Sequence, residues 1–318
     1  EEVSEAVRKS TLSEALPNTL SRNGSSPSGG LILPSVSKRY HYKAINNDYP
    51  SEFYEYNQKF VNCITHIKRR HDSVVSTIAQ GINEYKHQVG MNIIDNSIQM
   101  FLDRFYLSRI GIRMLIGQQI ALNQPKPQPG YVGIIETETS IAEVVQEAID
   151  NARFVCEDHY MLLETPNISL YCPKDLRFTY VSSHLHHMVF ELLKNSLRAV
   201  IELYGDEATS YPDIKVIICE GNEDITIKIS DEGGGIPRSE IDKVWTYMYT
   251  TATTPPVEDS LYKSDFKAPL AGFGYGLPLS RLYARYFGGD LRLISMEGYG
   301  TDAYIHLSRL SNSEEPLV

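Results

Sequence analysis

The spacing of apolar residues divides the chain into two halves with different expected secondary structure. From about Glu52 to Asn123, apolar residues recur every three or four positions, which predicts long helices separated by glycine or polar turns. Prolines at positions 125, 127 and 129 cannot continue a helix, so they indicate a domain boundary. The helices expected before this boundary are Phe53 to His66, His71 to Val89 and Ser97 to Asn123.

After the boundary, apolar and polar residues alternate, which is typical of strands. The isoleucines at 225, 227 and 229 alternate with polar residues, and the run from Ile214 to Ile218 does so too, with a Gly-Asn pair between the runs. This pattern predicts an antiparallel hairpin, and residues 291–296 and 303–307 predict a second one. Helices are expected at Ser183 to Leu203 and Leu277 to Phe287. The second half is therefore predicted to be a mixed sheet with helices on one face.

Length and local composition then set the expected domains. The 318 residues exceed the usual size of one domain, and 42% hydrophobic composition is enough for two cores. Residues 1–50 have weak periodicity and a Gly/Ser/Pro-rich stretch, so we expect poor order there. The expected parts are a segment at 1–50, a helical domain at 51–130, an α/β domain at 131–310 and a tail at 311–318.

Charge and cysteine spacing exclude several classes of protein. A net charge of -10 argues against broad nucleic-acid binding, because phosphate neutralisation needs a basic surface. No window has the roughly 18 consecutive apolar residues of a membrane span, and Glu1 and Glu2 begin neither a signal nor a transit peptide. The four cysteines have no C-x-x-C spacing, so neither a zinc site nor a disulfide framework is predicted.

One predicted helix has a dense polar face. At 100° per residue, the helix from His184 to Leu203 places five polar side chains within about 100° of one another. The opposite side is apolar and is expected to be core. A solvated face with intrahelical ion pairs is the simpler explanation, and a functional face is the alternative. The five residues are His187, Glu191, Lys194, Asn195 and Arg198.

A glycine-rich turn follows the strand that ends at Ser230. Asp231 comes directly after this strand, and Gly233 and Gly235 belong to a run of three glycines. Glycines let the backbone approach a ligand, and a carboxylate at the strand end can accept a hydrogen bond from an exocyclic amino group such as that of adenine. A plain glycine turn is the alternative.

Two further glycine motifs follow. Alternating glycines from Gly272 to Leu277 open a predicted helix, where free amide N–H groups and the helix dipole favour phosphate oxygens. The spacing is neither a P-loop nor a dinucleotide-binding motif. Thr301 ends a Gly-Tyr-Gly-Thr hairpin, where its hydroxyl could bind a base edge or a water beside Asp231; a two-glycine hairpin is the alternative. The residues singled out in the first motif are Gly272, Phe273, Gly274, Tyr275, Gly276 and Leu277.

Taken in order, E-x-x-x-N, D-x-G-x-G, G-x-G-x-G and G-x-G-T resemble the ATP-binding domain shared by gyrase, Hsp90, histidine kinases and MutL, the GHKL class. The resemblance implies an α + α/β chain, with an N-terminal four-helix bundle followed by a Bergerat-type α/β sandwich. It also implies that Asn195 holds Mg²⁺ against the phosphates of ATP and that Glu191 is the general base. Lys194 and Arg198 would offset phosphate charge.

Longer stretches narrow the resemblance. The runs 101–115, 190–198 and 268–278 closely resemble the pyruvate dehydrogenase kinases, and the branched-chain ketoacid dehydrogenase kinases match the segment before Gly272 less well. This implies a serine kinase that acts on the pyruvate dehydrogenase E1 alpha subunit in the mitochondrial matrix. It further implies a homodimer formed through the sheet of the second domain, docking on lipoyl domains of the E2 acetyltransferase, and ATP, Mg²⁺ and a K⁺ ion as cofactors.

The family resemblance also suggests roles for residues outside the main motifs. His187 would orient or tune Glu191 from the same helix face, and Thr250 and Thr251 would contact ATP within a lid between Trp245 and Leu270. Arg109 and Arg113 lie one helical turn apart, and His71 begins the preceding predicted helix. These three would bind inhibitory ketoacids, because guanidinium donors suit a carboxylate, although an ion-pair network within the bundle is the alternative.

Three other functions remain open at this stage. A histidine kinase would phosphorylate itself, with His71 as the candidate acceptor. An Hsp90-like ATPase would use Glu191 to activate water in place of a serine hydroxyl. A scaffold would bind ATP without transferring phosphate.

Overall fold

The computed structural model describes residues 50–309 except 91–94, 125, 127, 163, 174, 207, 209 and 252–272. Several predictions concern residues outside this range: the segment before residue 50, the tail at 311–318, Gly272 and most of the predicted lid.

Three helices precede the first strand in the described part of the chain. They are α2 (Ser51–Arg70), α3 (Val74–Val89) and α4 (Asn96–Leu122), close to the three predicted helices. Gly90 ends α3 in the left-handed conformation with φ 68°, which suits a residue without a Cβ. The expectation that His71 begins a helix is wrong, because this residue follows α2 in the turn before α3. A fourth helix of the expected bundle is not among the described residues.

The strands form two sheets. The smaller sheet has the order β1-β2-β4, from β1 (Tyr131–Val132), β2 (Ile135–Ser140) and β4 (Arg177–Tyr180). The larger has the order β3-β5-β6-β8-β7, in which only the β3–β5 pair is parallel. The predicted hairpins are confirmed as β5–β6 and β7–β8. The strands of the larger sheet are β3 (Ile168–Tyr171), β5 (Ile214–Glu220), β6 (Asp224–Asp231), β7 (Asp290–Met296) and β8 (Gly300–Ser308).

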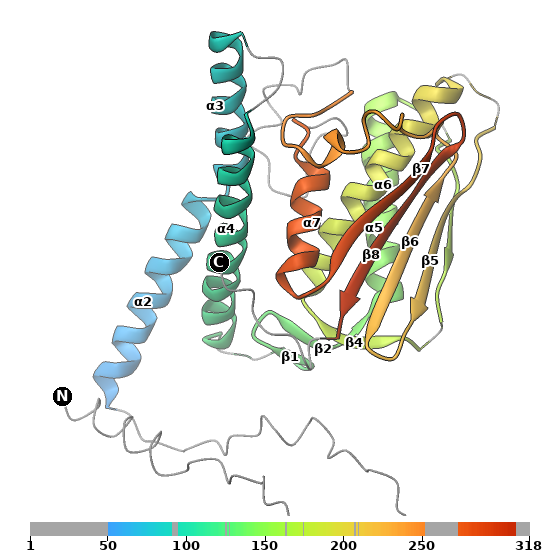
Figure 1. Cartoon of the computed structure of the whole chain (residues 1–318). Helices are drawn as coiled ribbons and strands as arrows, with labels where there is room; N and C mark the ends of the chain where they lie inside the picture. The colour runs from blue at the N-terminus through green and yellow to red at the C-terminus, as the bar shows by residue number, and fades with distance from the viewer. Residues whose placement is uncertain are drawn as a thin grey trace, which may run out of the picture. The chain divides into compact units, whose positions relative to one another are not determined.

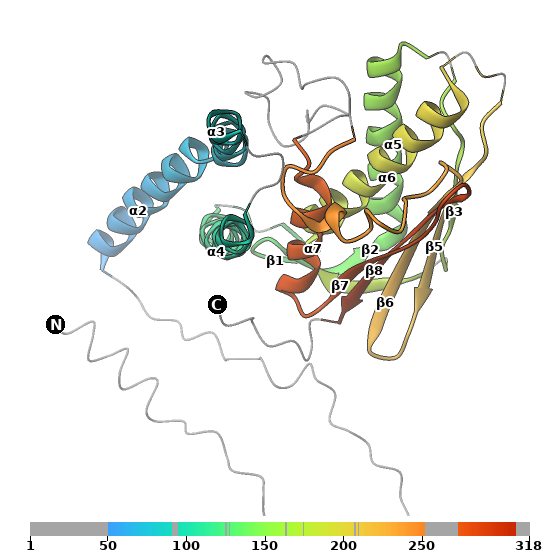
Figure 2. The same ribbon diagram turned by 45° about the horizontal axis from the view of Figure 1, so that its top comes forward.

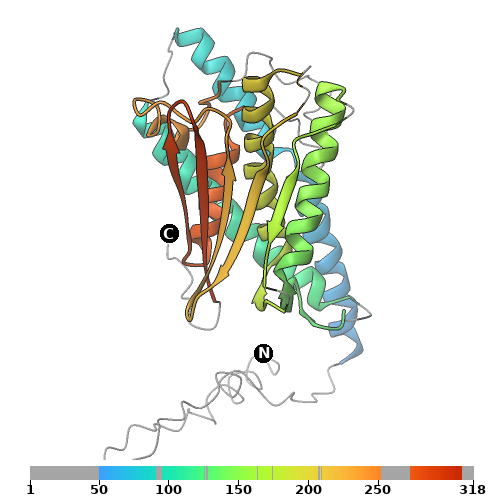
Figure 3. The same cartoon turned by 90° about the vertical axis from the view of Figure 1, so that its right-hand side faces the viewer.

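Three helices cover one face of the larger sheet, as predicted (Figures 1 and 2). They are α5 (Ile141–Tyr160), α6 (Ser182–Tyr204) and α7 (Gly276–Tyr286). The isoleucines of β6 at 225, 227 and 229 are completely buried and pack in one core with these helices, because alternate residues of a strand point to the same face. The opposite face of the sheet is turned toward the viewer in Figure 3. No helix within the described ranges is both long and apolar enough to cross a membrane.

A cluster of tyrosines joins α4 to α7 and to the segment after a short 3-10 helix, η2 (Lys243–Trp245). The ring of Tyr106 on α4 lies 5.6 Å from that of Tyr247 and 5.8 Å from that of Tyr275, between ring centroids. The Tyr247 hydroxyl donates a hydrogen bond of 2.8 Å to Asp103, and the Gln99 side chain bonds both backbone polar groups of Tyr247. The first residues of the predicted lid are therefore attached to α4.

Replacing Tyr247 by Phe tests this attachment. The change removes one hydrogen bond in a buried cluster and leaves Asp103 without that donor, so we expect unfolding to become easier by about 1–2 kcal/mol. Urea denaturation measures the difference. Tyr54→Phe is the matched control, because the Tyr54 side chain is 60% exposed on α2 and should change stability by less than about 0.5 kcal/mol. Equal effects of the two changes would contradict the proposed contribution.

Candidate nucleotide-binding site

Helix α6 has one apolar side and one side that carries polar groups. Leu192, Leu193 and Leu197 are buried in the core, whereas Asn195 is exposed and Arg198 is partly exposed. The expectation of a solvated polar face is wrong for Lys194, because only 3% of this residue is exposed. Its ammonium lies 4.9 Å from the ring centroid of Phe190.

The Lys194 ammonium forms an ion pair with the Glu191 carboxylate at 2.8 Å, and the two side chains are 4% and 13% exposed. Burial raises the pKa of the Glu191 carboxyl, but Lys194 and His187 together hold it below its ordinary value. The Glu191 carboxylate is therefore ionised at neutral pH. His187 is held against α7, where its ring centroid lies 5.0 Å from that of Tyr283.

The Asp231 carboxylate lies at the end of β6 beside α6. It accepts hydrogen bonds from the Ser196 hydroxyl at 2.8 Å and from the backbone N–H groups of Gly233 at 3.0 Å and Thr301 at 3.3 Å. Burial raises the pKa of the Asp231 carboxyl, although these three hydrogen bonds act in the opposite direction. Ser196 was not predicted as a site residue. It could have been identified from its place on the apolar side of α6, because a buried hydroxyl needs a hydrogen-bond partner.

The glycines of the motifs bring the chain close to itself at α6. A Cβ added to Gly233 would lie 2.6 Å from the Cβ of Ala199, and one added to Gly276 would lie 2.5 Å from Oε2 of Glu191. Gly274 has a φ of 76°, and a Cβ there would meet the backbone of Tyr249. The prediction explained these glycines by approach to a ligand. Backbone atoms therefore block a Cβ at Gly233 and Gly274 whether or not a ligand is bound, whereas the neighbour of Gly276 is the end of a side chain.

Arg198 connects α6 to the segment that contains Thr250 and Thr251. Its guanidinium donates to the Thr251 hydroxyl at 2.8 Å and to the Glu202 carboxylate at 2.8 Å. Thr250 is exposed next to this contact. Three separate parts of the sequence thus meet residues between positions 191 and 199 of α6. The predicted motif residues Phe273, Tyr275 and Leu277 are buried or half-buried around the start of α7.

The exposed amide of Asn195 is the candidate metal ligand on this surface. No group of three or more His, Cys, Asp or Glu side chains suited to a metal ion occurs within the described ranges. Mg²⁺ prefers oxygen ligands and retains several waters when it binds with phosphates. A single amide oxygen beside a nucleotide therefore suits Mg²⁺, which usually takes its other ligands from phosphates and waters and not from the protein.

The three residues of the candidate carboxylate pocket also come together. The Arg109 guanidinium donates to the backbone carbonyls of His71 at 3.1 Å and Asp72 at 3.3 Å. The Arg113 guanidinium forms an ion pair with Asp72 at 2.8 Å and donates to the Lys68 carbonyl at 3.3 Å. The ion-pair network considered from the sequence is therefore present. A carboxylate ligand of Arg113 would have to compete with Asp72.

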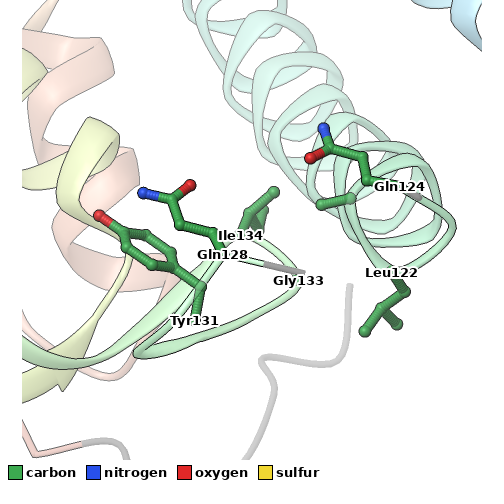
Figure 4. Close-up of a pocket in the computed structure, with 7 residues that line it drawn as sticks. Leu122, Gln124, Gln128, Tyr131, Gly133 and Ile134 are labelled. Carbon is green, nitrogen blue, oxygen red and sulfur yellow. The ribbon is translucent and has the colours of Figure 1, made fainter. Parts of the chain in front are cut away.

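A separate cavity of about 280 Å³ lies between the end of α4 and the β1–β2 hairpin. Gln128 and Tyr131 lie on its hairpin side and Gln124 at the end of α4 (Figure 4). It contains none of the predicted site residues, and its lining carries no charged group suited to phosphate. The remaining lining residues are Ala121, Leu122, Gly133 and Ile134.

Comparison with known proteins gives the class of the second domain. A profile of the histidine kinase-, DNA gyrase B- and HSP90-like ATPases matches residues 180–311, which include α6 and the three glycine motifs. The domain with this fold and site is an ATP-binding domain of that class. A second profile, for mitochondrial branched-chain alpha-ketoacid dehydrogenase kinase, matches residues 8–136.

The relatives narrow this class. The mitochondrial [pyruvate dehydrogenase (acetyl-transferring)] kinase of Arabidopsis thaliana is 52% identical over 81% of this chain and 70% of its own length. The kinase of Schizosaccharomyces pombe is 52% identical over 86% of this chain and 64% of its own length. Isozyme 1 of Rattus norvegicus is 42% identical over 93% of this chain and 68% of its own length. The chain belongs to the pyruvate dehydrogenase kinase family, and it spans less than two thirds of the Schizosaccharomyces pombe relative.

The close approach of Gly274 to the backbone of Tyr249 gives a stability prediction with a matched control. Gly274→Ala would place a Cβ 2.2 Å from the carbonyl oxygen of Tyr249 at a φ of 76°, so we expect a loss of about 1–3 kcal/mol from overpacking. Gly81 lies inside α3 with nothing within 4 Å of an added Cβ, so Gly81→Ala should be neutral or stabilise by up to about 1 kcal/mol. Urea denaturation measures both. Changes of the same sign in the free energy of unfolding of the two variants would contradict the close packing.

Proposed function

We propose that this chain is an ATP-dependent serine protein kinase that phosphorylates and inactivates the E1 alpha subunit of the pyruvate dehydrogenase complex. The observation that carries the proposal is the buried Glu191–Lys194 ion pair, which lies against Gly276 at the start of α7 and one helical turn before the exposed Asn195. The candidate base and the candidate metal ligand thus lie on one part of α6, beside the N-terminus of α7, which could bind phosphate. Family membership supports the same activity.

Each group has a separate chemical task in this proposal. Glu191 accepts the proton of the substrate serine hydroxyl, and its lowered pKa keeps it ionised for that task. Lys194 and His187 hold the carboxylate in place and tune its charge. Asn195 would hold Mg²⁺, which when bound offsets the charge of the phosphate oxygens. Asp231 accepts a hydrogen bond from the amino group of adenine, as its three donors leave lone pairs for this.

Further residues complete the proposed ATP site. The backbone N–H groups from Phe273 to Leu277, at the start of α7, would bind the phosphate oxygens. Gly233 and Gly235 would let the loop after β6 approach the adenine base. Arg198 holds Thr251 and its neighbour Thr250 at the same helix, where they would contact the nucleotide. A K⁺ ion as a further cofactor belongs to the same proposal.

Partners and location follow from family membership and from one surface. Ile294 and Met296 on β7 are 64% and 67% exposed, on the sheet face away from α5, α6 and α7. An apolar pair on an uncovered sheet face supports a homodimer formed through this sheet. The relatives are named mitochondrial, so the proposed location is the mitochondrial matrix, where the E2 lipoyl domains would be the docking partner.

The helical domain would supply regulation. Arg109 and Arg113 present guanidinium groups near the His71 turn, so a ketoacid carboxylate could bind them in exchange for the Asp72 contact. This site would bind pyruvate-like inhibitors.

A second candidate substrate is supported by one observation. The profile that matches residues 8–136 is named for the branched-chain alpha-ketoacid dehydrogenase kinase. The purified chain should therefore be incubated with Mg-[γ-³²P]ATP and each dehydrogenase complex in turn. Acid-stable label on the pyruvate dehydrogenase E1 alpha subunit supports the proposal. Label on the branched-chain complex alone, acid-labile label on the chain itself, or hydrolysis without transfer would each replace it with another function.

Asn195→Ala tests the metal ligand in the same assay. Loss of the amide oxygen should lower phosphotransfer at least about 10-fold, because even residues that only support a metal ligand cost that much when changed. Asn222→Ala is the control, since Asn222 is an exposed asparagine in the β5–β6 turn, at the other end of β6 from Asp231. Full phosphotransfer by Asn195→Ala would reject this role for Asn195.

The pH dependence tests the Glu191–Lys194 pair. Lys194→Met removes the ammonium that lowers the pKa of Glu191, so this pKa rises. Because only the ionised carboxylate accepts a proton, the acid limb of the pH profile of kcat/KM should move to higher pH. Lys194→Arg retains the positive charge and should leave the acid limb near the wild-type position. An acid limb that stays in place in Lys194→Met would show that Glu191 is not the titrating base.

A further inference from the structure

Three side chains form a row across the end of the larger sheet. Asp231 on β6 pairs with Thr301 on β8, and Thr301 pairs with Ser295 on β7. Directly paired residues of neighbouring strands point to the same face of a sheet. The row therefore runs from the carboxylate proposed to bind the adenine amino group, through the Thr301 hydroxyl, to the Ser295 hydroxyl. No role has been assigned to Ser295 so far.

The position of the Ser295 hydroxyl is set by the loop after β6. The backbone N–H of Ile236 donates to its oxygen at 2.7 Å. A Cβ on Gly235 would meet the backbone carbonyl of Met296, next to Ser295, so this loop lies directly on β7. The loop that carries the D-x-G-x-G motif thus occupies one lone pair of Ser295.

The single proton of Ser295 has two acceptors within reach. The Thr301 hydroxyl oxygen lies 2.9 Å away and the Gly300 carbonyl 3.2 Å away. If Ser295 donates to Thr301, the Thr301 proton is free to point toward a ligand. If Ser295 donates to Gly300, Thr301 donates back to Ser295 and offers only a lone pair to a ligand. The acceptor to which Ser295 donates therefore decides whether the Thr301 hydroxyl is a donor or an acceptor toward a ligand.

Adenine needs a donor at this position. Its ring nitrogen N1 is an acceptor beside the 6-amino donor, so a group next to Asp231 must donate to N1. A bridging water leads to the same requirement. A water that gives one proton to Asp231 and the other to N1 has only lone pairs left, so Thr301 must donate to that water.

We propose that Ser295 is a positioning residue for base recognition: it donates to Thr301 and so makes Thr301 a donor toward the N1 edge of adenine. Ser295 itself does not touch the nucleotide. The inference rests on the proposed function only in that the site binds ATP, and it adds the source of specificity at N1.

The test compares ATP with 1-deaza-ATP, in which a C–H group replaces N1. Direct binding constants are measured for the wild-type chain and for Ser295→Ala. Ser295→Ala removes the hydrogen bond that holds the Thr301 hydroxyl in place, so the Thr301 proton is no longer directed at N1. We therefore expect Ser295→Ala to weaken ATP binding about 5- to 10-fold, in the range of one hydrogen bond, and to leave 1-deaza-ATP binding within about 2-fold. A role in folding alone would weaken both nucleotides equally, and that result would overturn the inference.

Three variants sharpen the comparison. Thr301→Val should lose the same preference for ATP, and Ser295→Ala added to Thr301→Val should cause no further loss, because both act on one hydrogen bond. Ser295→Thr keeps the hydroxyl and should restore the preference. Ser230→Ala is the control, since Ser230 bonds Asp302 in the neighbouring row of the same sheet and should not change the ratio.

The outcomes separate the two proposals. ATP binding by the wild-type chain with an unchanged ratio of the two nucleotides in Ser295→Ala overturns the role of Ser295 alone. A wild-type chain that binds no ATP overturns the proposed function, and the role of Ser295 with it.

Discussion

The rest of the site depends on one interaction, the ion pair between Glu191 and Lys194 inside α6. Both side chains are almost buried, so each charge has lost most of its water and is compensated mainly by the other. A pair of this kind contributes little net stability, because desolvation offsets the attraction. Its value lies in chemistry: a carboxylate that remains ionised in a buried place, in contact with Gly276 at the start of α7.

The glycine motifs meet at the same helix. The Glu191 carboxylate lies beside Gly276 at the start of α7, and Ala199 leaves no room for a Cβ on Gly233. The two motifs thus approach α6 from α7 and from β6, and Arg198 holds Thr251 on the same helix. The site is an arrangement of backbone turns around a single helix, so small side chains at the contacts matter as much as the polar groups.

The first domain reaches the same region through aromatic contacts. Tyr106 on α4 packs against Tyr247 and Tyr275, which belong to the two segments on either side of residues 252–272. Arg109 lies one turn after Tyr106 and bonds the turn that contains His71. A displacement of α4 would therefore change the surface on which both segments pack, because close-packed groups do not deform independently.

The sequence by itself determined both hairpins, most of the helices and the motifs of the candidate site. Periodicities of two and of three to four residues are local consequences of strand and helix geometry, so both hairpins and the helices α4, α6 and α7 could be predicted within a few residues. Only the tertiary structure decided which polar groups are buried and what they contact. Lys194 was expected on a solvated strip and is buried, and His71 was expected to begin a helix and lies in a turn. Ser196 and Ser295 have partners 35 and 59 residues away in sequence, and such pairing depends on how strands and helices come together in space, which no local pattern encodes.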